Sequence, residues 1–447
     1  MDIITEQEFD SALDLSILTD DMEKLLKSEK RKKFIKNSNH NPDLMERLTM
    51  RAKRAKLKSR HGQTAELYDQ FYRDHKLLLK LFVILGVMPL ARQAGRVTFS
   101  WKSYQMYYAF IFYILTTLVV LKVGSERVKL LRITNEYDEY IYAIIFILFL
   151  LPHFWIPYVG WGVASQVAKY KSMWGTFQVR YYRVTGTTLV FPTLKIAIVI
   201  LFIGCVLLSI LFLFSLSQLL DDFLLWHTTA YFHIITMINM NAALFYINSK
   251  GTKIASKSLS DCFRKDMRVE CNYIMIKQYR LLWLNLSEIL QALGNAYART
   301  YCTYCLFMSI NITIGSYGAL SEILEFGFSY KVLGLVVLTI YCASLLFIIC
   351  DCAQSATSVM AEGVQSTLLS LNLLQLDVQT QKEIDHFISA IELNPPVVNL
   401  RGYALINREL LTATISTIAI YLIVLLQFKL SIVAQKCLQD SLQSAYN

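Results

Sequence analysis

The sequence predicts an all-α polytopic membrane protein with seven transmembrane helices, and two observations carry this prediction. Only 17% of the 447 residues are charged, whereas 55% are hydrophobic and the mean hydropathy is +0.40. Soluble domains are closer to one quarter charged, so a chain this apolar cannot cover its surface with polar groups. Seven apolar runs are also long enough, at about 20 residues each, to cross a bilayer as helices.

The seven runs follow one another between residues 104 and 430. Each contains few charges or none, and aromatic residues gather near several ends, for example Trp101 beside the first run and Tyr158 in the second. Aromatic residues are typical of the membrane–water interface. The predicted spans are about 104–121, 140–163, 196–216, 223–247, 300–321, 332–349 and 410–430.

The regions before and after this seven-helix domain, residues 76–430, are expected to be simpler. Residues 1–75 are rich in charge and are predicted to form a cytosolic tail, either solvated or attracted to anionic lipid. Nucleic-acid binding is disfavoured, because the chain is membrane-embedded and the tail has few aromatics. The stretch 76–90 is too short to span and predicts an interfacial or re-entrant helix. Residues 431–447 are expected to be a short extracellular C-terminus.

Several segments between the spans are predicted to be helices below the membrane. Residues 253–298 contain no Pro and show helical spacing of apolar residues, so the fourth and fifth helices should continue there, joined by a polar loop near 257–270. Residues 356–376 and 379–392 predict two more helices, and Pro395 and Pro396 should end the helical segment after them. The two cytosolic helical regions, 253–298 and 356–392, are expected to form an anchor below the membrane. Because these helices have apolar faces to bury, we expect oligomerisation.

The basic residues predict the orientation of the helices. Segments on the N-terminal side of the membrane hold 36 Lys and Arg residues, whereas those on the other side hold 6. Since positive loops stay in the cytosol, the N-terminus is expected inside and the C-terminus outside. This orientation is opposite to that of a G-protein-coupled receptor.

The sequence contains no constellation that indicates an enzyme, a metal or a cofactor. No phosphate-binding, nucleophile-elbow or zinc-protease motif occurs, and the seven His are scattered. Cys302 and Cys305 have metal-like spacing, but they lie in an apolar span without a second pair, which favours core thiols. Charges are nearly absent from the middle of the spans, which disfavours a coupled transporter.

The seventh span is the most informative stretch. Ile420, Val424, Gln427 and Phe428 share one helical face. In a ring of such helices, Gln427 would lie in a water-filled path, with Phe428 as an apolar constriction. Gln427 could equally be an amide that bonds across packed helices, and the residues alone leave both interpretations open.

This span resembles the C-terminal signature of insect gustatory receptors, which is Thr-Tyr, five hydrophobic residues and Gln-Phe. Tyr421, Gln427 and Phe428 match, and Ile420 stands in place of the Thr. The stretches 85–90 and 402–408 are also similar to that family, so the resemblance covers about 76–429. Residues 159–186 and 256–272 resemble its carbon-dioxide receptor clade.

The resemblance implies a tetrameric, ligand-gated cation channel in the plasma membrane of sensory neurons. Val424, Gln427 and Phe428 would be the pore and gate residues, and Tyr421 would pack behind them. The clade implies a heteromer with a related gustatory receptor subunit. Membrane lipid is the remaining partner, and neither an enzymatic role nor a cofactor is implied.

The expected ligand is carbon dioxide, bound in the outer half of the helices. His227, Tyr231 and Tyr317 are the candidate ligand-binding residues, and each could instead be an ordinary core residue. Whether the gas or bicarbonate is sensed stays open, as does a sugar or bitter ligand. The competing hypothesis is a seven-helix receptor that signals through a cytosolic partner.

Overall fold

The computed structural model describes residues 68–93, 96–133, 144–219, 225–269 and 271–446 of the chain. These residues form one unit, which is almost entirely helical. Most of the expected cytosolic tail lies outside the described residues. The first helix of the described residues is α4 (Gln70–Ile84). It starts six residues before the short helix predicted at 76–90.

Helix α4 and a small hairpin precede the first predicted span. The Asp69 carboxylate caps α4 by accepting a 3.0 Å hydrogen bond from the Tyr72 amide. The chain then turns through Gly86, whose φ of 69° favours glycine. Strand β1 (Ala91–Gln93) pairs antiparallel with β2 (Arg96–Thr98). Each strand has three residues, which is too short for an alternation of apolar and polar residues to predict the hairpin from the sequence.

Seven long helices, as predicted, make up most of the rest of the described residues. They are α5 (Tyr104–Ile133), α7 (Leu151–Thr185), α8 (Leu194–Leu219), α9 (Thr228–Val269), α10 (Tyr273–Phe326), α11 (Tyr330–Leu369) and α13 (Arg408–Tyr446). Among the described residues, six segments are long and apolar enough to cross a membrane, and α10 is less apolar. Ser309, Asn311 and Thr313 explain this difference, and their side chains donate to carbonyls four residues earlier in α10.

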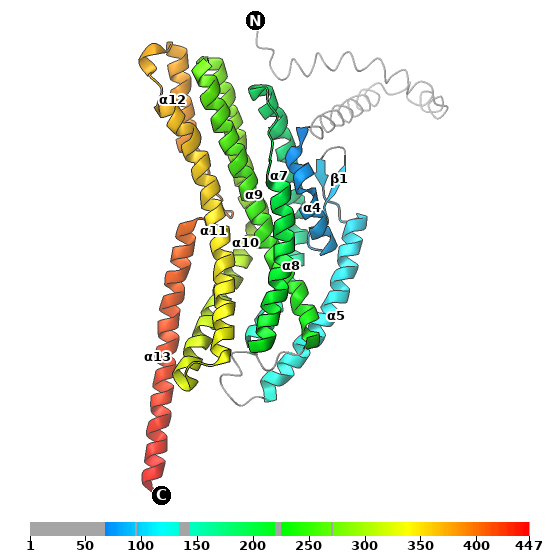
Figure 1. Ribbon diagram of the computed structural model, residues 1–447, viewed down its shortest axis with the longest axis vertical. Helices are drawn as coiled ribbons and strands as arrows, with labels where there is room; N and C mark the ends of the chain where they lie inside the picture. Colours follow the sequence, from blue (N-terminus) through cyan, green and yellow to red (C-terminus); the bar gives the residue numbers. More distant parts are fainter. Residues whose placement is uncertain (1–67, 94–95, 134–143, 220–224, 270, 447) are drawn as a thin grey trace, which may run out of the picture. The chain divides into compact units, whose positions relative to one another are not determined.

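Helix α9 lies at the centre of the packing. It contacts α8 and α11 most extensively and also packs against α7 and α10. Figure 1 shows that α7, α9 and α11 run through most of the domain, whereas α5 and α13 lie at one end only. The opposite end holds α12 (Val378–Leu393), which packs on α10 and α11.

The predicted loop near 257–270 is wrong for most of its length. Helix α9 continues to Val269, and α10 begins at Tyr273, where the Asn272 side chain accepts from the Met275 amide at 2.8 Å. The charged residues that suggested a loop lie on the exposed face of α9, while Phe263 and Met267 are buried. A polar run without Gly or Pro is compatible with an amphipathic helix.

The other helix boundaries also differ from the expectation. The predicted helix at 356–376 is the end of α11, which runs without a break from Tyr330 to Leu369. A short 3₁₀ turn (Leu373–Gln375) leads into α12, which an Arg280–Glu383 ion pair at 2.6 Å ties to α10. Helix α13 continues past residue 430 to Tyr446, because no Gly or Pro interrupts that stretch.

Candidate functional site

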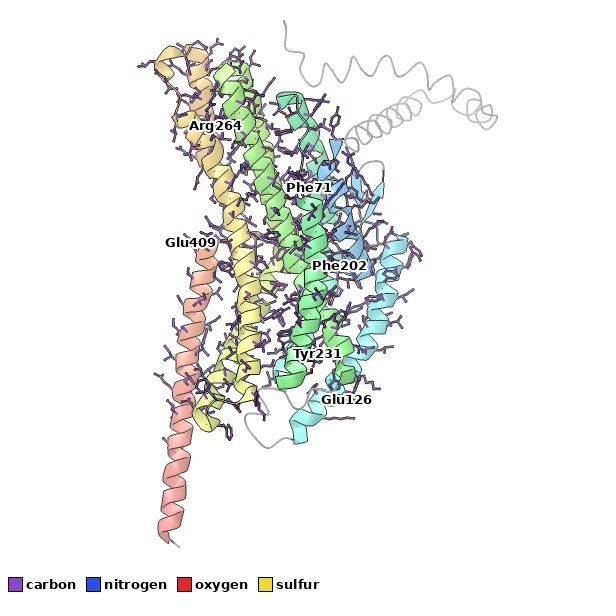
Figure 2. All side chains as sticks on the ribbon, viewed as in Figure 1. Phe71, Glu126, Phe202, Tyr231, Arg264 and Glu409 are labelled. Atoms are coloured by element: carbon purple, nitrogen blue, oxygen red, sulfur yellow. The ribbon has the colours of Figure 1, made fainter. Side chains whose placement is uncertain are left out.

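A small apolar cavity lies between helices at the end of the domain opposite α12. Figure 2 labels one of its residues, Tyr231, near Glu126 and far from Arg264. The cavity has a volume of about 20 Å³, and nine residues line it. They are Ile145, Phe146, Phe149, Leu216, Tyr231, Ile235, Gly334, Leu335 and Leu338. A space this small is suited to a single molecule of a few atoms.

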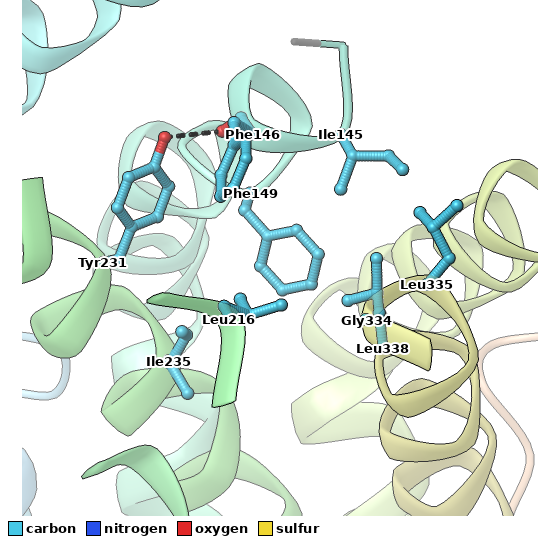
Figure 3. Close-up of a pocket in the computed structure, with 9 residues that line it drawn as sticks. All are labelled: Ile145, Phe146, Phe149, Leu216, Tyr231, Ile235, Gly334, Leu335 and Leu338. Carbon is cyan, nitrogen blue, oxygen red and sulfur yellow. Dashed lines mark hydrogen bonds between the residues drawn. The ribbon is translucent and has the colours of Figure 1, made fainter. Parts of the chain in front are cut away.

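The cavity is formed where four parts of the chain meet (Figure 3). Residues 144–148 are helical and lead into α7, with Pro152 near the start of α7. Leu216 comes from α8, Tyr231 and Ile235 from α9, and Leu335 from α11. The Tyr231 hydroxyl donates to the Phe146 carbonyl at 3.1 Å, which closes one side of the cavity.

Of the three ligand-binding residues predicted from the sequence, Tyr231 lines this cavity. His227 and Tyr317 are not among the nine lining residues. His227 is fully buried in a 3₁₀ turn (Leu225–His227), and its Nε2 lies 3.0 Å from the Glu126 carboxylate. Tyr317 is buried in α10. The structure therefore does not bring the three residues together around one cavity.

Sequence reasoning missed Arg127, which lies beside the cavity. Arg127 is only 2% exposed, and its guanidinium carbon lies 4.4 Å from the centroid of the Phe146 ring. The same guanidinium acts electrostatically on the Tyr231 hydroxyl. The predicted first span ends at residue 121 and leaves Arg127 outside it, but α5 continues to Ile133 and carries Arg127 into the packed bundle. A buried cation over an aromatic face stabilises this end of the cavity.

The predicted pore face of α13 points away from the rest of the subunit. Val424 is 40% exposed and Phe428 is 64% exposed, and Gln427 is exposed as well. Tyr421, which the resemblance places behind them, is 59% exposed within the described subunit. This face is available to lipid or to other subunits.

The opposite side of α13 is attached to α10. Among the described side chains of α13, only Ile418 and Lys429 are buried. The Lys429 amine lies 2.7 Å from the Glu325 carboxylate and donates to the carbonyl and hydroxyl of Ser321. A buried charge that is paired and hydrogen-bonded can hold a helix in a fixed rotation. Lys429 therefore ties this side of α13 to α10.

The start of α13 is fixed by a second set of polar contacts. Asn399 accepts from the Gly402 amide at 2.6 Å, and the φ of Gly402 is 85°. Arg408 then pairs with the Asp351 carboxylate of α11 at 2.6 Å. The segment 402–408, which contributed to the resemblance, thus forms the turn that sets the entry of α13.

Comparison with known proteins gives consistent matches over most of the chain. The family model described as 7tm Chemosensory receptor matches residues 75–432. Gustatory and odorant receptor 22 of Anopheles gambiae is 42% identical over 375 residues, which are 82% of this chain and 80% of that receptor. Gustatory and odorant receptor 21a of Drosophila melanogaster is 42% identical over 371 residues, 81% of this chain and 82% of that receptor.

The fold is similar to that of a solved receptor. The insect olfactory receptor OR5 from Machilis hrabei superposes with a TM-score of 0.57 and covers 81% of this chain and 99% of its own. Its complex with eugenol superposes with a TM-score of 0.54. Sequence identity is 12% in both cases, so the match concerns the fold alone.

Proposed function

Since the chain belongs to the 7tm chemosensory receptor family and is a relative of insect gustatory and odorant receptors, we propose that it is a carbon dioxide receptor subunit. In this proposal it forms a ligand-gated cation channel with a related subunit, and the exposed face of the seventh long helix, α13, lines the pore. The subunit resides in the plasma membrane of sensory neurons, with its N-terminus in the cytosol.

The size of the cavity is the observation that carries the choice of ligand. A volume of about 20 Å³ suits a linear triatomic molecule, whereas sites for larger organic ligands are typically about 300–1,000 Å³. A sugar or bitter compound would require the surrounding helices to move apart. None of the nine lining residues is charged, and the Arg127 guanidinium beside them lies over the Phe146 ring, which favours an uncharged ligand over bicarbonate.

Filling the cavity tests this proposal. Leu335→Phe places a larger side chain at a lining position, and we expect it to abolish currents evoked by a carbon dioxide step at fixed pH. Leu333→Phe is the matched control, because Leu333 lies on the same helix and is 50% exposed. Both variants are recorded with a partner subunit after surface expression is confirmed. Equal responses from both variants would rule out this cavity as the ligand site.

The exposed face of α13 supports the channel part of the proposal. Gln427 offers an amide to permeating ions, and Phe428 offers an apolar ring that can close a pore by excluding water. We expect Gln427→Ala to change ion selectivity or basal current in co-expressed receptors. Unchanged conductance and selectivity would leave Gln427 as a packing residue.

The orientation of the helices in the membrane separates this proposal from the competing hypothesis of a receptor that signals through a cytosolic partner. The charge distribution predicts that the C-terminus lies outside the cell. An epitope tag after Asn447 should therefore be accessible to antibody on intact cells. Access only after permeabilisation would contradict this orientation.

A further inference from the structure

A buried polar site lies where α4, α7 and α9 meet, away from the apolar cavity. Its centre is Lys171 of α7, which is 2% exposed. The Lys171 amine lies 3.0 Å from Nε2 of His75 and donates to the Asn248 side-chain carbonyl at 2.6 Å. Figure 2 labels Phe71, whose ring centroid lies 5.2 Å from this amine, well apart from Tyr231.

Four buried polar groups lie near this amine and interact with one another in two pairs, Tyr170 with Trp174 and Tyr297 with Asn248. They are the Asn248 side-chain nitrogen, the Trp174 indole nitrogen, and the hydroxyls of Tyr170 and Tyr297. The Tyr170 ring centroid lies 5.2 Å from the Lys171 amine and 6.1 Å from that of Tyr297. In each pair the nitrogen can only donate, so each hydroxyl keeps its own proton to offer to an added acceptor group.

The contacts of Lys171 favour its neutral amine. Both of its hydrogen-bond partners are uncharged when His75 is neutral, and a buried ammonium without an ion pair is costly. Asp69 is the carboxylate that acts on Lys171, but it is shared with Arg92 at 3.5 Å and with Gln178 at 3.0 Å. Burial raises the pKa of the Asp69 carboxyl above its usual range, which weakens it further as a counter-charge.

We propose that Lys171 is a carbamylation site, at which carbon dioxide adds reversibly to the buried amine. The nitrogen lone pair attacks the carbon of carbon dioxide, an N–C bond forms, and one C–O π bond opens to leave a carboxylate. The nitrogen proton passes to Nε2 of His75, which is already within hydrogen-bond distance. The products are a carbamate and an imidazolium, so the reaction needs no other reactant and leaves the net charge unchanged.

The surrounding donors match the product better than the reactant. A carbamate carboxylate has about four lone-pair directions, and the hydroxyl protons of Tyr170 on α7 and Tyr297 on α10 can occupy two of them. The new imidazolium on α4 pairs with the carbamate on α7, which strengthens the contact between these two helices. Carbon dioxide is small and uncharged, so a buried site is accessible to it when packed side chains fluctuate.

Chemical trapping on the full-length protein in membranes tests the site. A trialkyloxonium reagent converts a carbamate into a stable ester, and mass spectrometry then locates it after digestion. We expect an adduct on Lys171 whose mass follows the isotope when ¹³C-labelled carbon dioxide replaces ¹²C. Lys171→Arg should lose the adduct entirely. Lys169→Arg is the matched control, because Lys169 is exposed on the same helix, and it should leave the Lys171 adduct intact.

A second variant tests the proton acceptor. We expect His75→Asn to lower the yield of trapped adduct while the protein still reaches the cell surface. Absence of an adduct at Lys171 in the wild-type protein, or an equal adduct on every exposed lysine, would overturn the inference. Labelling that is unchanged in the His75 variant would also contradict the proposed step.

The inference uses the same ligand as the proposed function, and recordings separate their failures. An adduct on Lys171 without any current evoked by carbon dioxide would leave the modification site standing and contradict the receptor proposal. A normal current in wild type and in Lys171→Arg, with no adduct, would contradict the modification site alone. Loss of the current in Lys171→Arg, but not in Lys169→Arg, would connect the site to gating.

Discussion

Helices α9 and α13 are both apolar and long enough to cross a membrane, yet they have opposite surroundings. In the most apolar stretch of α9, 83% of the residues are buried within the subunit, compared with 6% in α13. Helix α9 is enclosed by α7, α8, α10 and α11, whereas α13 contacts only α10 and α11 extensively. The other helices of a single subunit therefore cover α9 but leave most of α13 exposed.

The more polar of the two helices is the buried one. Asn239, Asn241 and Asn248 all lie in α9 and are at most 2% exposed. Tyr341 of α11 donates to Asn239 at 2.8 Å, and Asn239 donates to Ser209 of α8 at 3.0 Å. Polar groups in a membrane helix need protein partners, whereas apolar side chains are equally stable against lipid. Hydropathy alone thus indicates that a helix spans, and its polar residues indicate where it packs.

The largest expected effect tests this contrast in the stability of one subunit. Leu244→Ala removes a side chain of α9 that is fully buried, and we expect it to lower the free energy of unfolding by about 2–5 kcal/mol. Ile423→Ala on α13 is the control, since Ile423 is 57% exposed and leaves no cavity within the subunit. Thermal unfolding of the solubilised subunit measures both. Similar losses for the two variants would mean that α13 packs more extensively within one subunit than the structure shows.

A smaller effect is expected at the contact that orients α13. Lys429→Met keeps the length of the side chain but removes its charge and its bonds to Ser321 and Glu325. Hydrogen bonds to charged groups contribute about 1.5–3 kcal/mol each, and the partial exposure of Glu325 reduces this, so we expect a loss of about 1–2 kcal/mol. The same unfolding assay measures it.

Lys429→Met should also alter the basal current, because α13 becomes free to rotate about its axis. Lys436→Met is the control for a charge lost from the same helix beyond the predicted span. An unchanged basal current together with reduced stability would show that Lys429 stabilises α13 without setting its orientation.

The sequence predicted the seven helices and their order because long apolar runs have few alternatives in a bilayer. The sequence did not predict that α9 continues to Val269, because the charged residues near Arg264 are typical of a loop. Only the structure shows that Phe263 and Met267, between these charges, are buried. Tyr231 was predicted as a ligand residue, and the structure places it at a cavity. The other lining residues, and Arg127 beside them, come from five separate segments whose proximity depends on packing.

The smallest expected effect concerns the polar contacts that fix α9 between its neighbours. Asn239→Leu leaves the Tyr341 hydroxyl without its acceptor and Ser209 without one donor. Side-chain hydrogen bonds within membrane bundles contribute about 0.6 kcal/mol on average and up to about 1.7 kcal/mol, so we expect a loss of about 1 kcal/mol. Unfolding of the solubilised subunit measures this loss.

A double-mutant cycle with Tyr341→Phe separates the hydrogen bond from the change in packing. Tyr341→Phe removes only the hydroxyl, so a ring that stacks 4.3 Å from Phe212 stays in place. If Asn239 and Tyr341 are coupled through their hydrogen bond, the double variant should be destabilised by less than the sum of the two single variants. Strict additivity would mean that this bond does not hold α9 against α11, and that apolar packing alone explains why α9 is enclosed while α13 is not.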